Sequence, residues 1–185
     1  MLKSNLKIIV SIFPEKAQEC GLMCSMLNTC KNITAIEINA SCPNIYESIL
    51  ENEKKVIQIC NIAKHQAKHP LILKIGYSHS INMIQTVSQH IEAIHAINSV
   101  PWPIVFPNKK SPLENYGGGG VSGPIIAEFS RKKVSELVKK TNLSIIAGGG
   151  IASHNDIKIF QQLGAKACSI GSAFFRPWKP NRIIK

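Results

Sequence analysis

The strongest constraint on the fold is a repeated alternation between short apolar segments and longer segments with helical periodicity. The short segments are rich in β-branched residues and almost continuously apolar, which is typical of parallel strands buried on both faces. Strands are predicted at residues 6–12, 35–39, 71–75, 93–98, 144–147 and 167–170. Strands that alternate with helices at this spacing form βα units. We therefore expect one parallel sheet, either doubly wound or closing toward a barrel.

Helical patterns fill several of the intervals between these segments. They lie at residues 47–67, 80–87, 126–138 and 153–164. Ser80 is a suitable N-cap for the second helix, because its hydroxyl can accept a hydrogen bond from the first turn. Ser153 and Asp156 approximate a capping box for the last helix, which Gly164 is placed to close.

One long segment, residues 100–124, interrupts this rhythm. It contains Pro101, Pro103, Pro107 and Pro112, and then the run Gly117–Gly120, so it is predicted to be an irregular loop. Long loops after strands of α/β proteins usually carry function. The chain has 185 residues and shows neither an internal repeat nor an interdomain linker, so we interpret residues 1–185 as a single domain.

Charge and composition narrow the class of ligand. The chain has 22 Lys and Arg against 11 Asp and Glu, a net charge of +11. The charges are scattered, aromatic residues make up only 6%, and no nucleic-acid motif accompanies them. We therefore expect an anionic small molecule rather than a nucleic acid as partner. No window approaches the roughly 18 uncharged apolar residues of a membrane helix, so no membrane association is expected.

The six cysteines indicate neither a metal site nor an oxidising compartment. They stand at positions 20, 24, 30, 42, 60 and 168 and form no CxxC pair. A zinc ribbon is therefore excluded, and the spacing fits no iron–sulfur signature. The N-terminus has no clear features of a secretory signal. We expect reduced thiols, no metal and a cytoplasmic location.

Candidate chemical groups follow the predicted strands, where ligands bind in parallel α/β folds. Cys42 stands in a turn before Pro43, where its thiol is either a base or nucleophile or only a small turn residue. Lys74 interrupts an apolar run, and because a buried unpaired ammonium is costly, it pairs with an anion or lies in water at the rim. Asn98 and Ser99 end the next strand. His95 in that strand is interpreted as a hydrogen-bonded core residue.

Two glycine clusters follow the last two predicted strands, at residues 148–150 and around Gly171. Glycines let backbone N–H groups approach a phosphate, and a following helix N-terminus favours the negative charge. A phosphate site built from the last two βα loops is common in barrels. The pair of clusters therefore favours a barrel over a doubly wound sheet.

Taken together, these motifs resemble the class 1 dihydroorotate dehydrogenases, which are FMN-dependent TIM barrels. The matching stretches, in the family's order, are IEINASCPN (36–44), LILKIG (71–76), IHAINS (94–99), GGGGVSGP (117–124), IIAGGGI (145–151) and GAKACSIGSA (164–173). The resemblance covers roughly residues 30–180. It implies oxidation of dihydroorotate to orotate in pyrimidine (UMP) biosynthesis.

The resemblance also implies roles for individual residues. Cys42 falls at the position of the catalytic base. The positions that contact the substrate are matched by Asn39, Asn44, Asn98 and Ser99. The positions that hold FMN and its phosphate are matched by Lys74, Gly123, Gly149, Gly150, Gly171 and Ser172.

The chain departs from the family in length. A complete TIM barrel has eight strands and about 250 residues, whereas six strands are visible here. We therefore expect an incomplete (β/α)8-type barrel that lacks its N-terminal part.

The identity of the electron acceptor stays open between fumarate, a quinone, and NAD through a partner subunit. A homo-oligomer is expected. The alternatives are a pyrimidine-base reductase, although such enzymes tend to have histidine where this chain has Asn44, and a remnant without turnover.

Overall fold

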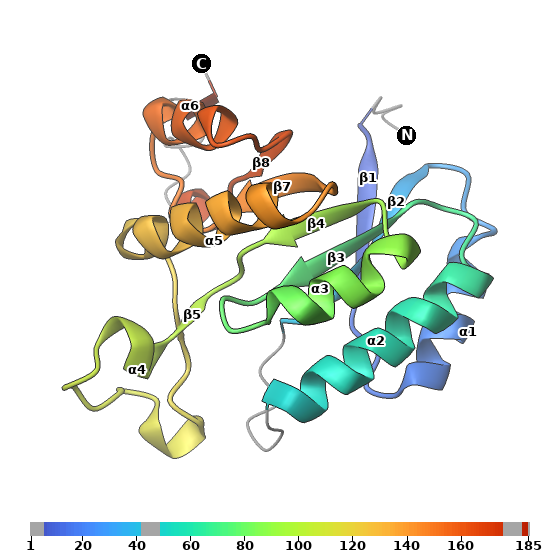
Figure 1. The fold of residues 1–185 in the computed structure, drawn as a ribbon, viewed down its shortest axis with the longest axis horizontal. Coiled ribbons are helices and arrows are strands. Elements are labelled where there is room, and N and C mark those ends of the chain that lie inside the picture. The colour runs from blue at the N-terminus through green and yellow to red at the C-terminus, as the bar shows by residue number, and fades with distance from the viewer. Residues whose placement is uncertain (1–5, 42–48, 176–182, 185) are drawn as a thin grey trace.

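Six parallel strands form one curled sheet (Figure 1). The computed structural model describes residues 6–41, 49–175 and 183–184. The strands are β1 (Ile8–Ile12), β2 (Ile33–Asn39), β3 (Leu71–Ile75), β4 (Ala93–Ala96), β7 (Ser144–Gly148) and β8 (Ala167–Ser169). All six predicted strands are confirmed. They lie in the order β1-β2-β3-β4-β7-β8, without the reversal of a doubly wound sheet, so the fold is an incomplete α/β barrel.

The helices lie between the strands along the chain. They are α1 (Ala17–Leu27), α2 (Ile49–Gln66), α3 (Ile81–Val87), α4 (Trp102–Val105), α5 (Ala127–Lys140) and α6 (His154–Gln162). Both predicted caps are confirmed: the Ser80 hydroxyl accepts from the Met83 N–H at 3.1 Å, and the Ser153 hydroxyl accepts from the Asp156 N–H at 3.2 Å. Within the described ranges, no helix has both the length and the apolar character needed to cross a membrane.

The sequence analysis did not predict α1, because its apolar residues do not keep to one face. Cys20 and Cys24 are fully buried, whereas Leu22 is 69% exposed and Met26 is 73% exposed. Gly21 in the middle of the helix weakens the pattern further, since glycine is a poor helix former. Packing against α2 therefore stabilises this helix more than its own periodicity does.

The two faces of the sheet differ in chemistry. Side chains of a strand alternate between faces, and partners in neighbouring strands share a face. One face carries Ile36, Leu73, Ile94 and other apolar residues, which form a single core with buried side chains of α1, α2, α3 and α5. The opposite face carries polar side chains. On that face Ser11 of β1 pairs in register with Glu37 of β2, and Lys74 of β3 pairs in register with His95 of β4.

The irregular segment predicted at residues 100–124 is confirmed and contains a small hairpin. Its strands β5 (Val100–Pro101) and β6 (Gly120–Val121) pair antiparallel, and in Figure 1 the segment extends away from the main sheet. Three successive glycines, Gly117–Gly119, have φ between 68° and 80°. Other residues adopt this conformation only with strain, so the glycine run is needed to turn the chain back toward β6.

Strand β1 has one free edge within the described sheet, since its partner is β2 alone. Apolar side chains stay exposed on and beside it: Leu6, Ile8, Ile9 and Phe13. An exposed apolar edge strand is a template for pairing with another chain. This edge is therefore the surface through which we expect the chain to associate with itself.

We predict that the chain self-associates through β1 and that Ile9→Lys weakens this association. Ile9 is 47% exposed, and a lysine on an edge strand resists pairing because its charge would have to be desolvated. Sedimentation velocity over a range of concentrations measures the effect. Tyr116→Lys adds the same charge at an exposed residue of the irregular segment and should leave association unchanged. A wild-type chain that stays monomeric throughout, or an Ile9→Lys variant of unaltered mass, would contradict the prediction.

Candidate functional site

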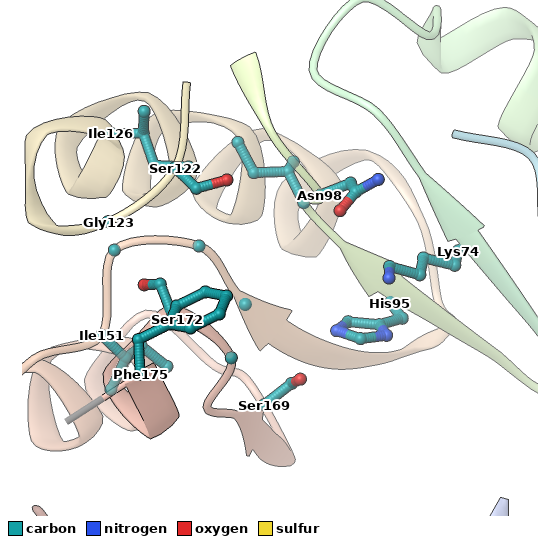
Figure 2. A pocket seen from close by; sticks show the side chains of 15 residues that line it. Lys74, His95, Asn98, Ser122, Gly123, Ile126, Ile151, Ser169, Ser172 and Phe175 are labelled. Atoms are coloured by element: carbon teal, nitrogen blue, oxygen red, sulfur yellow. The ribbon is translucent and has the colours of Figure 1, made fainter. Parts of the chain in front are cut away.

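A cavity of about 190 Å³ opens at the carboxyl ends of β3, β4, β7 and β8. Figure 2 shows its lining. Lys74, His95 and Asn98 come from the ends of β3 and β4, and they lie at one end of the cavity. Glycine-rich turns after β7 and β8 form the other end, together with Ser122 and Gly123. The cavity is therefore polar at both ends and built from backbone at one of them.

Seven of the eleven predicted site residues meet in this cavity. They are Lys74, Asn98, Gly123, Gly149, Gly150, Gly171 and Ser172. These residues span almost 100 positions of sequence, and the parallel order of the strands brings them together.

Of the other four predicted residues, Asn39 and Ser99 are described by the structure and are not among the residues that line the cavity. Asn39 ends β2 beside Lys74, and its side-chain oxygen accepts hydrogen bonds from the Ser41 N–H at 3.2 Å and the Ser41 hydroxyl at 2.6 Å. Ser99 instead packs against Gly120, where a Cβ would come within 2.2 Å of the serine oxygen. Cys42 and Asn44 lie outside the described residues.

The glycines of the cavity serve different purposes. Gly150 has φ +82°, and a Cβ there would lie 2.5 Å from the Cα of Ala127. This glycine is required by the close packing of the turn after β7 against the start of α5. Gly171 lines the cavity but has no heavy atom within 4 Å of the position its Cβ would take. A side chain at Gly171 would therefore occupy open space rather than collide with the protein.

Asp156 ties the turn after β7 to its surroundings. One carboxylate oxygen accepts from the N–H groups of Ala152 at 3.1 Å and Ser153 at 2.9 Å, and the other accepts from the Arg131 guanidinium at 2.7 Å. Burial alone would raise the pKa of Asp156, but a hydrogen bond from the Ser153 hydroxyl, the two backbone hydrogen bonds and the Arg131 charge together lower it below its usual value. Ser130 fixes the same region from α5, since its hydroxyl donates to the Gly148 carbonyl.

A charged cluster that the sequence analysis missed lies beside the cavity. Glu37 is buried on β2 and accepts hydrogen bonds from the Ser11 hydroxyl at 2.8 Å and from His95 Nδ1 at 2.7 Å. Burial acts to raise the pKa of Glu37, but the hydrogen bonds from His95 and Ser11 and the charge of Lys74 lower it overall. Glu37 is therefore ionised at neutral pH.

The Glu37 cluster corrects the interpretation of His95, which was expected to be a core residue. One ring nitrogen is satisfied by Glu37, but the ring also lines the cavity (Figure 2). A signal was present in the sequence, because Glu37 interrupts an apolar strand as Lys74 does. Two residues of opposite charge in neighbouring buried strands indicate that their side chains interact. Only the strand register shows that His95 also contacts Glu37.

The arrangement suits an elongated ligand with two different polar ends. Lys74 and Asn98 offer hydrogen-bond donors to a ring edge, and the glycine turns with Ser172 offer a backbone cradle suited to an anion. Across the part of the chain that the structure describes, no group of three or more His, Cys, Asp or Glu side chains is placed to hold a metal ion.

Comparison with known proteins identifies the relatives of this chain. The sequence model of the family described as dihydroorotate dehydrogenase matches residues 2–185. The catalytic subunit of dihydroorotate dehydrogenase B (NAD(+)) from Desulforamulus reducens is 27% identical over 192 residues, covering 99% of this chain and 62% of the relative. The protein of the same name from Caldicellulosiruptor bescii is 32% identical, covering 94% of this chain and 60% of the relative.

Solved structures agree on the fold. The crystal structure of DHODH from Eimeria tenella in complex with ferulenol superposes with a TM-score of 0.77 at 18% identity, covering 98% of this chain and 57% of that one. The ligand-free DHODH of the same organism superposes with a TM-score of 0.73. The chain spans about 60% of the length of the curated relatives named above.

We predict that Asp156→Asn lowers the free energy of unfolding by about 1–2 kcal/mol at pH 7, because the amide cannot accept all the hydrogen bonds of the carboxylate. The pKa of Asp156 is lowered in the fold. Its stabilising effect is therefore present above the ordinary carboxyl pKa and is lost as the pH falls through the folded value. Urea unfolding at pH 7 and below pH 4 measures both effects.

Glu128→Gln is the control for this prediction, since Glu128 faces the same Arg131 at 3.7 Å but is 84% exposed. An exposed ion pair contributes little, so this variant should unfold like the wild type. Equal stability of Asp156→Asn and wild type at pH 7, or a difference that grows toward low pH, would contradict the account of the turn.

Proposed function

The chain belongs to the dihydroorotate dehydrogenase family, and from this premise we propose that it binds FMN in the cavity of Figure 2 and oxidises dihydroorotate to orotate, a step of pyrimidine biosynthesis. One observation carries the proposal. A lysine, an amide and two glycine turns that are far apart in the sequence line a single cavity at the carboxyl edge of the sheet. A cofactor with a polar ring at one end and a phosphate at the other fits such a cavity.

The residues fit FMN in two respects. The Gly171 position is open toward the cavity, and glycine turns let backbone N–H groups approach a phosphate closely. Gly123, Gly149, Gly150 and Ser172 complete this end. At the other end the Lys74 ammonium is placed to interact with the electron-rich edge of the ring, and a cation there tunes the electronics of a flavin.

The substrate chemistry falls to residues at the ends of β2 and β4. We assign to Cys42 the removal of a proton from C5 of dihydroorotate, while FMN, when bound, accepts the hydride that leaves C6. Asn39, Asn44, Asn98 and Ser99 are assigned to hold the substrate ring by their side-chain amides and hydroxyl. Asn39 ends β2 and Asn98 follows β4, on either side of β3, so both stand at the carboxyl edge of the sheet.

The electron acceptor is proposed to be NAD(+), reached through a partner subunit. The relatives described above are named as NAD(+)-type catalytic subunits, and this supports NAD(+) over fumarate or a quinone. The proposed activity is that of the whole protein, since this chain spans about 60% of the length of the relatives named above.

The phosphate assignment predicts that Gly171→Asp weakens FMN binding by about tenfold or more relative to Gly171→Asn, because a carboxylate facing the phosphate adds like-charge repulsion. The two side chains have nearly the same shape and enter the same open space, so the comparison isolates charge. Titration followed by flavin fluorescence measures both constants. Equal affinities would refute the phosphate position, and a wild-type chain without affinity for FMN would refute the proposed function.

The base assignment predicts that Cys42→Ala slows reduction of bound FMN by dihydroorotate by a factor of about 10²–10⁴, the usual contribution of general acid–base catalysis. The flavin should stay bound, because the change removes only the thiol. Stopped-flow absorbance measures the rate. Cys168→Ala is the control, since Cys168 lies half-buried on β8 and lines no part of the cavity. An unchanged rate in Cys42→Ala would exclude the role.

A further inference from the structure

Three ionisable side chains stand next to one another on the polar face of the sheet, on three adjacent strands. Lys74 of β3 and His95 of β4 are partners in register. Glu37 of β2 reaches across β3 and meets His95 Nδ1 at 2.7 Å. Lys74 and His95 both line the cavity, whereas Glu37 is buried and is not among the lining residues.

The ionised Glu37 determines which nitrogen of His95 carries hydrogen. A carboxylate can only accept hydrogen bonds, so His95 Nδ1 must donate. Glu37 from β2 and Lys74 from β3 are charged groups on the same face of the sheet as His95, and the neighbour of His95 on β7 is Ile146. The neutral ring therefore has its lone pair at Nε2.

His95 Nε2 has no hydrogen-bond partner among the described residues, and the ring borders the cavity. Gly148 of β7 leaves room for it, since a Cβ there would lie 3.0 Å from Nε2. A polar atom in such a position requires a partner, because leaving it unpaired costs free energy. The cavity is the side from which that partner can come.

Lys74 and His95 together present a donor beside an acceptor. The Lys74 ammonium can only donate, whereas Nε2 of the Nδ1–H form accepts. A ring edge that places a carbonyl oxygen next to an N–H group complements this pair. The pyrimidine-like edge of the flavin ring has this imide pattern, with the carbonyl oxygen O2 beside N3–H.

We propose that His95 is a further cofactor-binding residue: its Nε2 accepts a hydrogen bond from the flavin N3–H beside Lys74, and Glu37 is the positioning residue that fixes the ring. This inference rests on the proposed function, since it deepens the assignment of FMN to this cavity. It assigns a binding role to His95 and explains why a charged residue is retained at Glu37 inside the sheet.

The test compares FMN with 3-methyl-FMN, which has a methyl group in place of the N3 hydrogen. The wild type should bind the methylated cofactor about 3- to 10-fold more weakly, the value of a lost hydrogen bond at a site that otherwise matches the ligand. His95→Ala should bind FMN more weakly by a similar factor and should no longer discriminate against the methyl group. A merely structural role for His95 would weaken both cofactors equally.

Glu37→Gln separates the hydrogen bond from a steric effect of the methyl group. The glutamine amide can donate to Nδ1, which places the hydrogen of the neutral ring on Nε2, so FMN affinity should fall while the shape of the cavity is kept. His65→Gln, on the exposed surface of α2, is the control and should behave like the wild type. Because the glutamine oxygen can instead accept from Nδ1–H, Glu37→Leu, which offers a partner to neither form, is the decisive variant, and unchanged discrimination in Glu37→Leu would overturn the positioning role of Glu37.

The tautomer of His95 can be measured in the wild type without cofactor, so this test does not depend on whether a variant folds. ¹⁵N NMR of the histidine rings in the wild type should show His95 as the Nδ1–H tautomer, and an Nε2–H tautomer would overturn the inference. If the wild type binds FMN but not more tightly than 3-methyl-FMN, the inference fails and the proposed function stands. If the wild type binds no FMN, both fail.

Discussion

The site depends on the in-register parallel pairing of β2, β3, β4, β7 and β8. Because paired residues share a face, this register gives the sheet one apolar face for the helices and one face on which Glu37, Lys74 and His95 can meet. Parallel strands also end at a common edge, which brings the turns after β7 and β8 beside the end of β3. A slip of one residue in any strand would turn its polar residues into the core. The register that forms the core therefore also forms the site.

The two ends of the cavity are held in different ways. The glycine end is backbone packed on backbone: Gly150 has no room for a side chain, and Asp156 and Ser130 tie the adjoining turn to α5. The opposite end is held by charge. Glu37 is buried, and its hydrogen bonds from His95 and Ser11, with the Lys74 charge nearby, offset the cost of removing a carboxylate from water. A rigid cradle at one end and a fixed donor and acceptor at the other suit a cofactor that must be held in one orientation.

Much of this architecture could be predicted from the sequence, because local signals agree with the fold. Apolar β-branched runs located all six strands, and Ser80 and Ser153 marked helix starts. Helix α1 was not predicted, since its exposed Leu22 and Met26 remove the periodic pattern. The Glu37–His95 pair was not predicted either, because the two residues are 58 positions apart and only the register brings them together. The sequence places Asn39 and Ser99 at the ends of predicted strands. The contacts of Asn39 with Ser41 and of Ser99 with Gly120 depend on loop geometry that sequence patterns do not define.

We propose that one cavity holds FMN with its ring at Lys74 and its phosphate at the glycine turns. A crystal structure of the chain with FMN tests this most directly. The account predicts the ring edge within hydrogen-bond distance of Lys74 and His95, and the phosphate between the turns at Gly149 and Gly171. A flavin bound in the reverse orientation, or bound elsewhere on the chain, would contradict it.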